Sequence, residues 1–139
     1  MLQNHMENIL FTLDGKPLPE PTLSAAKAAY EAAKKCQTID ELKAAIETFD
    51  GCALKKNALN TVLADGVFGA DLVVVGEAPG AQEDEQGKPF VGRSGKLLDQ
   101  MLEAIGHTRA KNTYISNGLF WRPPENRTPT PLELATVRP

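Results

Sequence analysis

A glycine-rich segment in the middle of the chain combines carboxylates with an aromatic residue. It spans residues 76–95 and reads GEAPGAQEDEQGKPFVGRSG. Its glycines permit tight turns and a close approach of the backbone to a ligand. Glu77 and Glu83 supply carboxylates, and Phe90 lies on no periodic face. Taken singly, Glu83 fits a surface position and Phe90 fits core packing. Loops of this length are uncommon in compact domains and usually functional, so the segment is a candidate ligand site.

The end of this segment opens a predicted helix whose N-terminus could hold an anion. Free N–H groups and the helix dipole favour a negatively charged group such as a phosphate at that position. Arg93 and Lys96 add positive charge there, and Ser94 is placed to cap the helix. A nucleotide-binding P-loop is excluded, because the segment lacks the Gly-Lys-Ser/Thr that completes such a loop.

A second polar cluster follows further along the chain. Asn117 lies near the end of a predicted strand, and Arg122, Asn126 and Arg127 occupy the proline-containing loop after it. A side-chain amide both donates and accepts hydrogen bonds, so Asn117 could read the edge of a base. Taken alone, Asn117 also fits a turn-forming role. The joint occurrence of the two clusters favours a binding site.

Two predicted strands and a helix between them position both clusters. DLVVV at residues 71–75 is typical of a buried parallel strand, and TYISNGLF at residues 113–120 forms a second strand. SGKLLDQMLEAIG at residues 94–106 has one apolar helical face, and Gly106 is placed to end it. This order predicts a βαβ unit with a right-handed crossover. Ligands of open parallel sheets bind beyond the carboxyl ends of the strands, where both clusters lie.

The first third of the chain has a different composition and predicts helices instead of strands. Residues 1–21 are irregular and proline-containing, which is typical of an arm or linker. One helix is predicted through AAKAAYEAAKKC, with Thr22 or Ser24 as its cap. A second is predicted through LKAAIETF, with Thr38 as N-cap and Glu41 completing a capping box. We therefore predict an arm and a helical hairpin over residues 1–50, packed beside a main domain over residues 51–139.

Composition and charge set limits on function. The chain has 139 residues, of which 42% are hydrophobic and 24% charged, as in ordinary globular domains. We find no apolar run near the roughly 20 residues that cross a bilayer and no secretory signal, so we expect no membrane partner and a cytoplasmic location. The net charge of -3 does not favour a nucleic-acid binder, but a local positive field matters more than the sum. The basic residues after Gly87 are Lys88, Arg93, Lys96, Arg109, Lys111, Arg122, Arg127 and Arg138.

Three strings in the later part of the chain carry a resemblance to a known family. They read VVVGEAPGAQEDEQGKPFVGRSGKLLDQML, YISN and WRPPENRTPTP. The segment from Cys52 to Pro139 resembles the bacterial and archaeal family-four uracil-DNA glycosylases. The resemblance implies an α/β fold, a three-layer α/β/α arrangement with a four-stranded, mostly parallel sheet, truncated here. It also implies hydrolysis of the N-glycosidic bond of uracil in DNA, as in base-excision repair.

The resemblance also implies roles for individual residues. Glu77 and Ala78 fall in the family's water-activating motif, and Glu83 matches a glutamate of its active site. Phe90 matches the aromatic residue that stacks on the flipped-out uracil, and Asn117 matches the amide that reads the uracil edge. These types fit the chemistry, because the target base must leave the duplex and a carboxylate favours a cation-like sugar. Which glutamate matters more for water stays open. The candidate contacts to DNA are Arg93, Ser94, Lys96, Arg122 and Arg127.

The iron–sulfur cluster of the family is not expected in this chain. The resemblance implies four cysteine ligands, and only Cys52 falls on such a position. Phe49, Trp121 and Val137 stand at the other three and could fill the volume with apolar packing. We predict no cluster, no metal and no other cofactor. The two cysteines of the chain are expected to be free, buried thiols and not a disulfide, as in most cytosolic proteins.

One family motif has no counterpart in residues 1–139. It is a downstream histidine with prolines and a serine, whereas His5 and His107 lie in other contexts. A truncated, non-catalytic DNA-binding remnant or accessory module is therefore the alternative to an enzyme. In both cases the expected partner is uracil-containing DNA. Absent sheet strands would leave an unpaired edge, so we also predict self-association through that edge.

Overall fold

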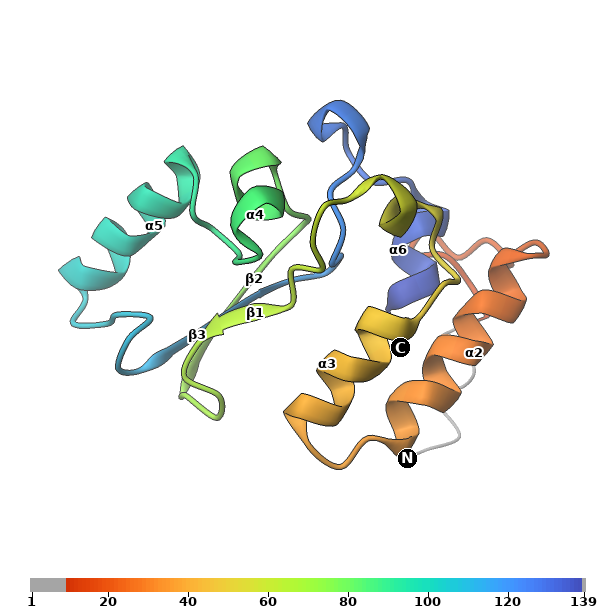
Figure 1. Ribbon diagram of the computed structural model, residues 1–139, viewed down its shortest axis with the longest axis horizontal. Coiled ribbons are helices and arrows are strands. Elements are labelled where there is room, and N and C mark those ends of the chain that lie inside the picture. The colour runs from red at the N-terminus through yellow and green to blue at the C-terminus, as the bar shows by residue number, and fades with distance from the viewer. Residues whose placement is uncertain (1–9, 139) are drawn as a thin grey trace. The chain divides into compact units, whose positions relative to one another are not determined.

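The computed structural model describes residues 10–138 and divides them into two compact units. The first unit comprises residues 10–55 and 129–138, and the second comprises residues 56–128. Figure 1 labels the elements of both units. The first nine residues of the predicted arm, with His5, lie outside the described residues. The predicted domain division at residues 50 and 51 stays a prediction.

The first unit contains the predicted helical hairpin. Helix α2 spans Thr22–Lys35 and helix α3 spans Ile39–Thr48. The N-cap position of α2 is Pro21, so the prediction that Thr22 or Ser24 caps it is wrong. The Thr38 hydroxyl accepts a hydrogen bond from the backbone N–H of Glu41, which confirms the predicted N-cap. The Glu41 carboxylate reaches one residue further back than a capping box requires, and accepts from the N–H of Gln37.

A third helix of this unit, α6, spans Pro131–Val137 and was not predicted. It begins with a complete capping box, in which Thr130 and Glu133 each accept a backbone N–H of the other residue. Helix α6 packs against α2, where Ala26 and Ala135 belong to a small buried core (Figure 1).

The second unit contains a three-stranded sheet in the order β1-β3-β2. Strands β2, Leu72–Gly76, and β3, Thr113–Asn117, pair in parallel, with Gly76 opposite Asn117. Strand β1, Ala64–Gly66, pairs antiparallel with β3. The α/β class is confirmed, but the sheet is small and mixed, whereas the resemblance implied a mostly parallel one. Strand β1 was not predicted, because three residues are too few to carry a periodic pattern.

Two helices connect the parallel strands of the second unit. Helix α4 spans Ala81–Gln86, inside the segment predicted as a loop, and α5 spans Arg93–Ala104. The N-cap of α5 is Gly92, so the prediction that Ser94 caps this helix is wrong. The Glu83 carboxylate from α4 instead accepts the N–H of Gly92 and places a negative charge at the helix N-terminus. Gly106 follows the C-cap residue Ile105 with a left-handed φ of +78° and ends the helix, as predicted.

Strand β3 ends three residues earlier than predicted. Its partner β2 ends at Gly76, and beyond Asn117 the ladder gives way to single bonds, from the Gly118 N–H to the Gly76 carbonyl and from the Val62 N–H to the Phe120 carbonyl. The apolar alternation nevertheless continues, because the Leu119 and Trp121 side chains are fully buried. The indole N–H of Trp121 donates to the Thr61 hydroxyl over 3.0 Å.

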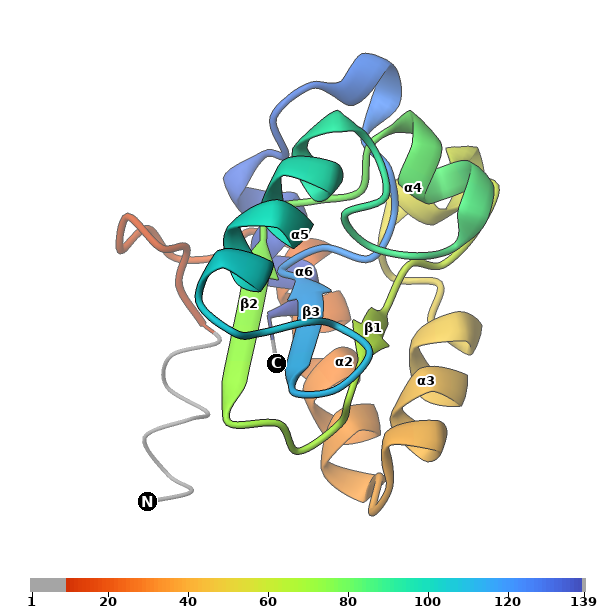
Figure 2. The same cartoon turned by 90° about the vertical axis from the view of Figure 1, so that its left-hand side faces the viewer.

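One face of β2 is exposed, so the prediction of a fully buried strand is wrong. Val73 and Val75 are 54% and 65% exposed. Helices α4 and α5 lie on the same side of this sheet (Figures 1 and 2), so the described residues of the unit supply two of the three expected layers. The predicted apolar face of α5 is likewise only partly covered: Leu102 is buried, whereas Met101 and Ile105 are exposed. Within residues 10–138 we find no helix long and apolar enough to cross a membrane.

Candidate active site

The register of the sheet brings both predicted polar clusters together. Because Gly76 lies opposite Asn117, the loops that follow β2 and β3 leave the sheet side by side. They enclose a pocket of about 300 Å³, at the lower end of the range for ligand sites. Its lining residues are Glu77, Ala78, Pro79, Gly80, Glu83, Phe90, Ser94, Asn117, Pro123, Asn126 and Arg127.

The Phe90 ring and the Asn117 amide, which both line the pocket, lie next to each other. A β-carbon added at Gly76 would lie 2.5 Å from the Phe90 Cζ and 2.4 Å from the Asn117 Oδ1, so both groups meet above this glycine. Asn117 is only 6% exposed. Among residues 10–138 its side-chain amide has no hydrogen-bond partner, and the amide is accessible from the pocket that Asn117 lines. The amide is therefore free to bind the polar edge of a ligand that stacks on the ring.

Phe90 has an unusual backbone conformation. Its φ of +52° is left-handed, a region that bulky residues rarely adopt. The first turn of α5 presses against it, because a β-carbon at Gly95 would lie only 1.8 Å from the Phe90 carbonyl oxygen. The ring itself is half-buried and lines the pocket. The backbone around Phe90 thus fixes the direction in which the ring points.

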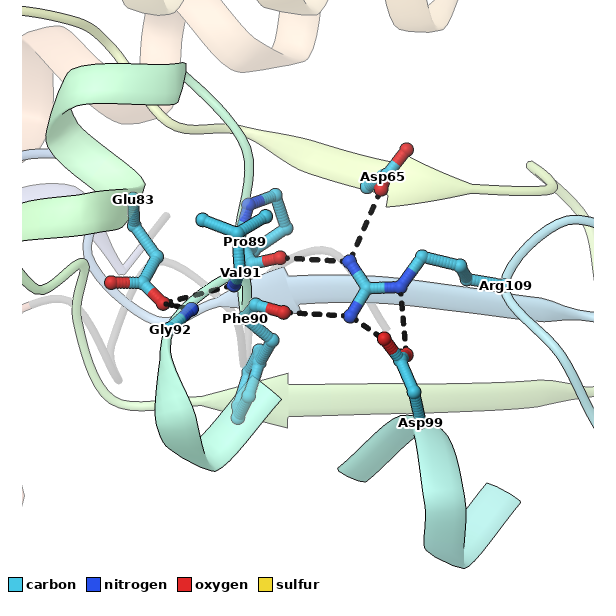
Figure 3. Close-up of polar contacts among 8 residues, drawn as sticks. All are labelled: Asp65, Glu83, Pro89, Phe90, Val91, Gly92, Asp99 and Arg109. Carbon is cyan, nitrogen blue, oxygen red and sulfur yellow. Dashed lines mark hydrogen bonds and ion pairs between the residues drawn. The ribbon is translucent and has the colours of Figure 1, made fainter. Parts of the chain in front are cut away.

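Glu83 holds the loop that carries Phe90. Its Oε1 accepts the N–H groups of Val91 and Gly92, each over 2.9 Å (Figure 3). Partial burial by itself raises the pKa of the Glu83 carboxyl, but hydrogen bonds from backbone amides, Gly92 first among them, outweigh that effect. The net pKa is lowered below the ordinary value, so the carboxylate is ionised at neutral pH and keeps accepting these bonds.

Glu77 differs from Glu83 in its surroundings. It is exposed at the mouth of the pocket, and its carboxylate has no partner among the described residues. Ala78, the next residue, is half-buried and contributes to the pocket wall. Of the two glutamates, Glu77 is the one with both carboxylate oxygens available, whereas the Oε1 of Glu83 already accepts two backbone N–H groups.

The predicted DNA contacts divide into two groups. Ser94 and Arg127 line the pocket. Arg93 and Lys96 are exposed on the first turn of α5 and do not line it. Arg122 also lies outside the lining, and its Nε donates to the Asn126 Oδ1 over 2.7 Å.

Sequence reasoning missed some of the residues that shape this site. Pro79 and Pro123 are fully buried pocket residues, and their only signal was their place inside the two polar loops. In the sequence, Arg109 is only one of the basic residues that follow Gly87, and nothing there assigned it a role. In the structure it bonds the backbone of the Phe90 loop from outside the pocket, and no local pattern marks that contact.

The residues at the four cluster positions do not fit an iron–sulfur cluster. Only Cys52 carries a sulfur atom, and burial raises the pKa of its thiol, with a smaller effect from the negative charge of Glu133. Trp121 donates its only side-chain N–H to the Thr61 hydroxyl. Cys52 and Cys36 are both free thiols, but only Cys52 is buried as predicted, whereas Cys36 is partly exposed. No group of three potential metal-ligating residues occurs in the described part of the chain.

Fold and site together define a class of protein. This is an α/β protein with a ligand pocket at the carboxyl end of two parallel strands, and the pocket suits a planar ring with a polar edge. The sequence model described as "Uracil DNA glycosylase superfamily" matches residues 64–139. That match covers more than half of the chain, which therefore belongs to the uracil DNA glycosylase superfamily.

Curated relatives point to one branch of this superfamily. The chain is 46% identical over 98 residues to the type-4 uracil-DNA glycosylase of Archaeoglobus fulgidus, and this aligned region covers 70% of this chain and 49% of that protein. It is 48% identical over 84 residues to the type-4 enzyme of Thermotoga maritima, covering 60% and 43%. It is 41% identical over 101 residues to the type-4 enzyme of Pyrobaculum aerophilum, and the aligned region covers 73% of this chain and 51% of that protein. The chain spans about half the length of these relatives.

Proposed function

We propose that the protein binds uracil flipped out of DNA and hydrolyses its N-glycosidic bond. The observation that supports this most is the meeting of the Phe90 ring and the free Asn117 amide above Gly76. Stacking holds any base, whereas a buried amide discriminates by the polar edge. The relatives named above are called uracil-DNA glycosylases, and their names support the choice of uracil.

In the proposed reaction, a water oxygen bonds to C1′ of the deoxyribose and the bond between C1′ and N1 of uracil breaks. The bonding electron pair leaves with uracil as an anion, and the water gives up a proton to solvent or to the departing base. We assign Glu77 to orienting the water and to favouring the cation-like sugar. Glu83 is assigned to holding the Phe90 loop, because its Oε1 already accepts two backbone N–H groups.

The assignment of the two glutamates can be tested by single-turnover hydrolysis of a uracil-containing oligonucleotide, followed by alkaline cleavage at abasic sites. Glu77→Gln is expected to lower the rate with little change in affinity, and Glu83→Gln to lower affinity as well.

Because residues 1–139 hold no counterpart of the family's histidine motif, we expect release to be slowed by about 10²–10⁴-fold compared with a domain that has one. Uracil-selective binding with no release would favour the non-catalytic alternative. No preference for uracil over cytosine in either assay would contradict the proposal.

Phe90→Ala is expected to weaken binding of a uracil-containing oligonucleotide by about tenfold or more. Base–aromatic stacking contributes about 1–3 kcal/mol per base. Fluorescence anisotropy with a non-hydrolysable 2′-fluorinated uridine would measure the loss. Phe68→Ala is a matched control in the same unit, because Phe68 is exposed and packs edge-on against Tyr114 outside the pocket. Equal affinities of the wild type and a folded Phe90→Ala variant would assign Phe90 to packing alone.

We also propose that the protein works without an iron–sulfur cluster or other cofactor. The support is that Phe49, Trp121 and Val137 lack the sulfur atoms that such a cluster requires. Protein purified without oxygen is expected to show no visible charge-transfer absorption and no stoichiometric iron. A brown protein with about four iron atoms per chain would overturn this prediction.

We further propose that copies of the chain associate through the free edge and exposed face of β2, in the cytoplasm. The support is that β2 is an outer strand of the described sheet and that Val73 and Val75 are exposed. Sedimentation velocity is expected to show oligomers that the double substitution of Val73 and Val75 by lysine converts to monomers. A monomeric wild type at about 100 µM would refute self-association at this edge.

A further inference from the structure

The strongest unassigned feature of the second unit is an arginine whose side chain is almost buried. The Arg109 side chain is 18% exposed, so it is poorly placed to neutralise a DNA phosphate. Its guanidinium uses all of its donors within this unit. Nη1 donates to the Pro89 carbonyl over 3.0 Å and to Asp65 over 3.1 Å, and Nη2 donates to the Phe90 carbonyl over 2.7 Å. Nε and Nη2 also contact Asp99 at 2.9 Å (Figure 3).

The segment of residues 89–92 is therefore held from two sides. Figure 3 shows Arg109 on one side, where the carbonyl groups of Pro89 and Phe90 point, and Glu83 on the other. The Glu83 carboxylate accepts the next two N–H groups along the chain. A left-handed backbone at a phenylalanine is strained and persists only where its surroundings impose it. Hydrogen bonds from the Arg109 guanidinium and to the Glu83 carboxylate hold consecutive peptide groups and can impose this conformation.

We infer that Arg109 is a positioning residue, which orients the ring of Phe90 over Gly76 by holding the two carbonyl groups of the loop. The meaning of this orientation for DNA binding rests on the proposed function. Asp65 and Asp99 balance the charge of the guanidinium and fix its plane. Lysine cannot replace it, because a single ammonium lacks the planar fork that reaches two carbonyl groups and two carboxylates together.

The inference is tested on the whole 139-residue chain with Arg109→Lys. Affinity for the non-hydrolysable uridine oligonucleotide is expected to fall about tenfold, and by no more than in Phe90→Ala. The double variant Arg109→Lys with Phe90→Ala is expected to bind like Phe90→Ala alone, since both changes remove one contact. Losses that multiply in the double variant would show that Arg109 does not act through Phe90. Arg138→Lys is the matched control, because that arginine also donates to a backbone carbonyl but belongs to the first unit.

A second measurement does not depend on DNA. The Gly76 backbone lies close enough to the Phe90 ring to give a nuclear Overhauser effect between the Gly76 Hα and the ring protons. This signal is expected in the wild type and in Arg138→Lys, and is expected to be weakened or lost in Arg109→Lys. Its persistence in Arg109→Lys would overturn the inference. A wild type that gives the signal but does not prefer uracil would refute the proposed function and leave the positioning role standing.

A milder variant covers the case in which Arg109→Lys does not fold. Asp99 is half-exposed, so Asp99→Asn loosens the plane of the guanidinium without removing its bonds to the loop. We expect a loss of affinity of about two- to threefold and a weaker Gly76–Phe90 signal, in line with the modest strength of exposed ion pairs. An unchanged affinity together with an unchanged signal would count against a positioning role for Arg109.

Discussion

Gly76→Ala is expected to lower the affinity for a uracil-containing oligonucleotide by about 30-fold or more while the protein stays folded. The new methyl group would lie 2.4 Å from the Asn117 Oδ1 and 2.5 Å from the Phe90 Cζ, so both groups must move apart. Stacking and amide readout each contribute about 1–3 kcal/mol, which together correspond to about 30-fold to 10⁴-fold in affinity. The neighbours are ends of side chains, so the backbone of β2 can stay in place.

Anisotropy titrations with the non-hydrolysable uridine oligonucleotide would measure this loss. Gly118→Ala is the matched control at the end of the neighbouring strand, because its β-carbon would meet its nearest atoms at an ordinary 3.8 Å. Adding Phe90→Ala to Gly76→Ala is expected to cost little more, since the ring is already displaced. An affinity of Gly76→Ala within threefold of the wild type would show that binding of the base does not depend on the positions of the Phe90 ring and the Asn117 amide.

Gly95→Ala is expected to lower the free energy of unfolding by about 3 kcal/mol. Alanine is the better helix former by about 1 kcal/mol, so an unhindered substitution within α5 would stabilise the protein. At this position, however, the β-carbon would lie 1.8 Å from the Phe90 carbonyl oxygen and 2.1 Å from its carbonyl carbon. Both are backbone atoms, so the helix and the loop must separate, and such overpacking costs more than the propensity gains.

Urea denaturation followed by the fluorescence of Trp121 would measure the change in the unit that contains the substitution. Trp121 is the only tryptophan and is 1% exposed, so its emission reports unfolding of this unit. The slope of the transition should stay constant, which would assign the change to stability. Gly118→Ala again serves as the control, with an expected change below about 1 kcal/mol. A Gly95→Ala variant as stable as the wild type would mean that the contact with Phe90 relaxes freely.

Much of the local structure could be predicted because it depends on short-range patterns. The apolar run that ends at Gly76 gives β2, and the helical periodicity from Leu97 onward gives α5. The N-cap Thr38 and the terminating Gly106 act on neighbouring backbone groups, so their roles are visible in sequence. Helix α6 carried an equally local signal, the Thr130 capping box with a proline after it, and could have been found in the same way.

Other elements had no local signal. Strand β1 has three residues and exists only through its pairing with β3. The end of β3 at Asn117 is set by the end of its partner, while the apolar alternation runs on to Trp121. The exposure of Val75 likewise depends on what covers the sheet and not on the residue type.

The sequence by itself determined which residue types stand at the carboxyl ends of two parallel strands, and the family resemblance that those strings carry. Only the tertiary structure separated three neighbouring carboxylates of the same chemistry. Asp84 is buried and accepts the N–H groups of Leu59 and Asn60. Glu83 grips the Phe90 loop, and Glu77 stays free at the pocket mouth. The role of a carboxylate depends on which donors from distant parts of the chain reach it, and folding decides that.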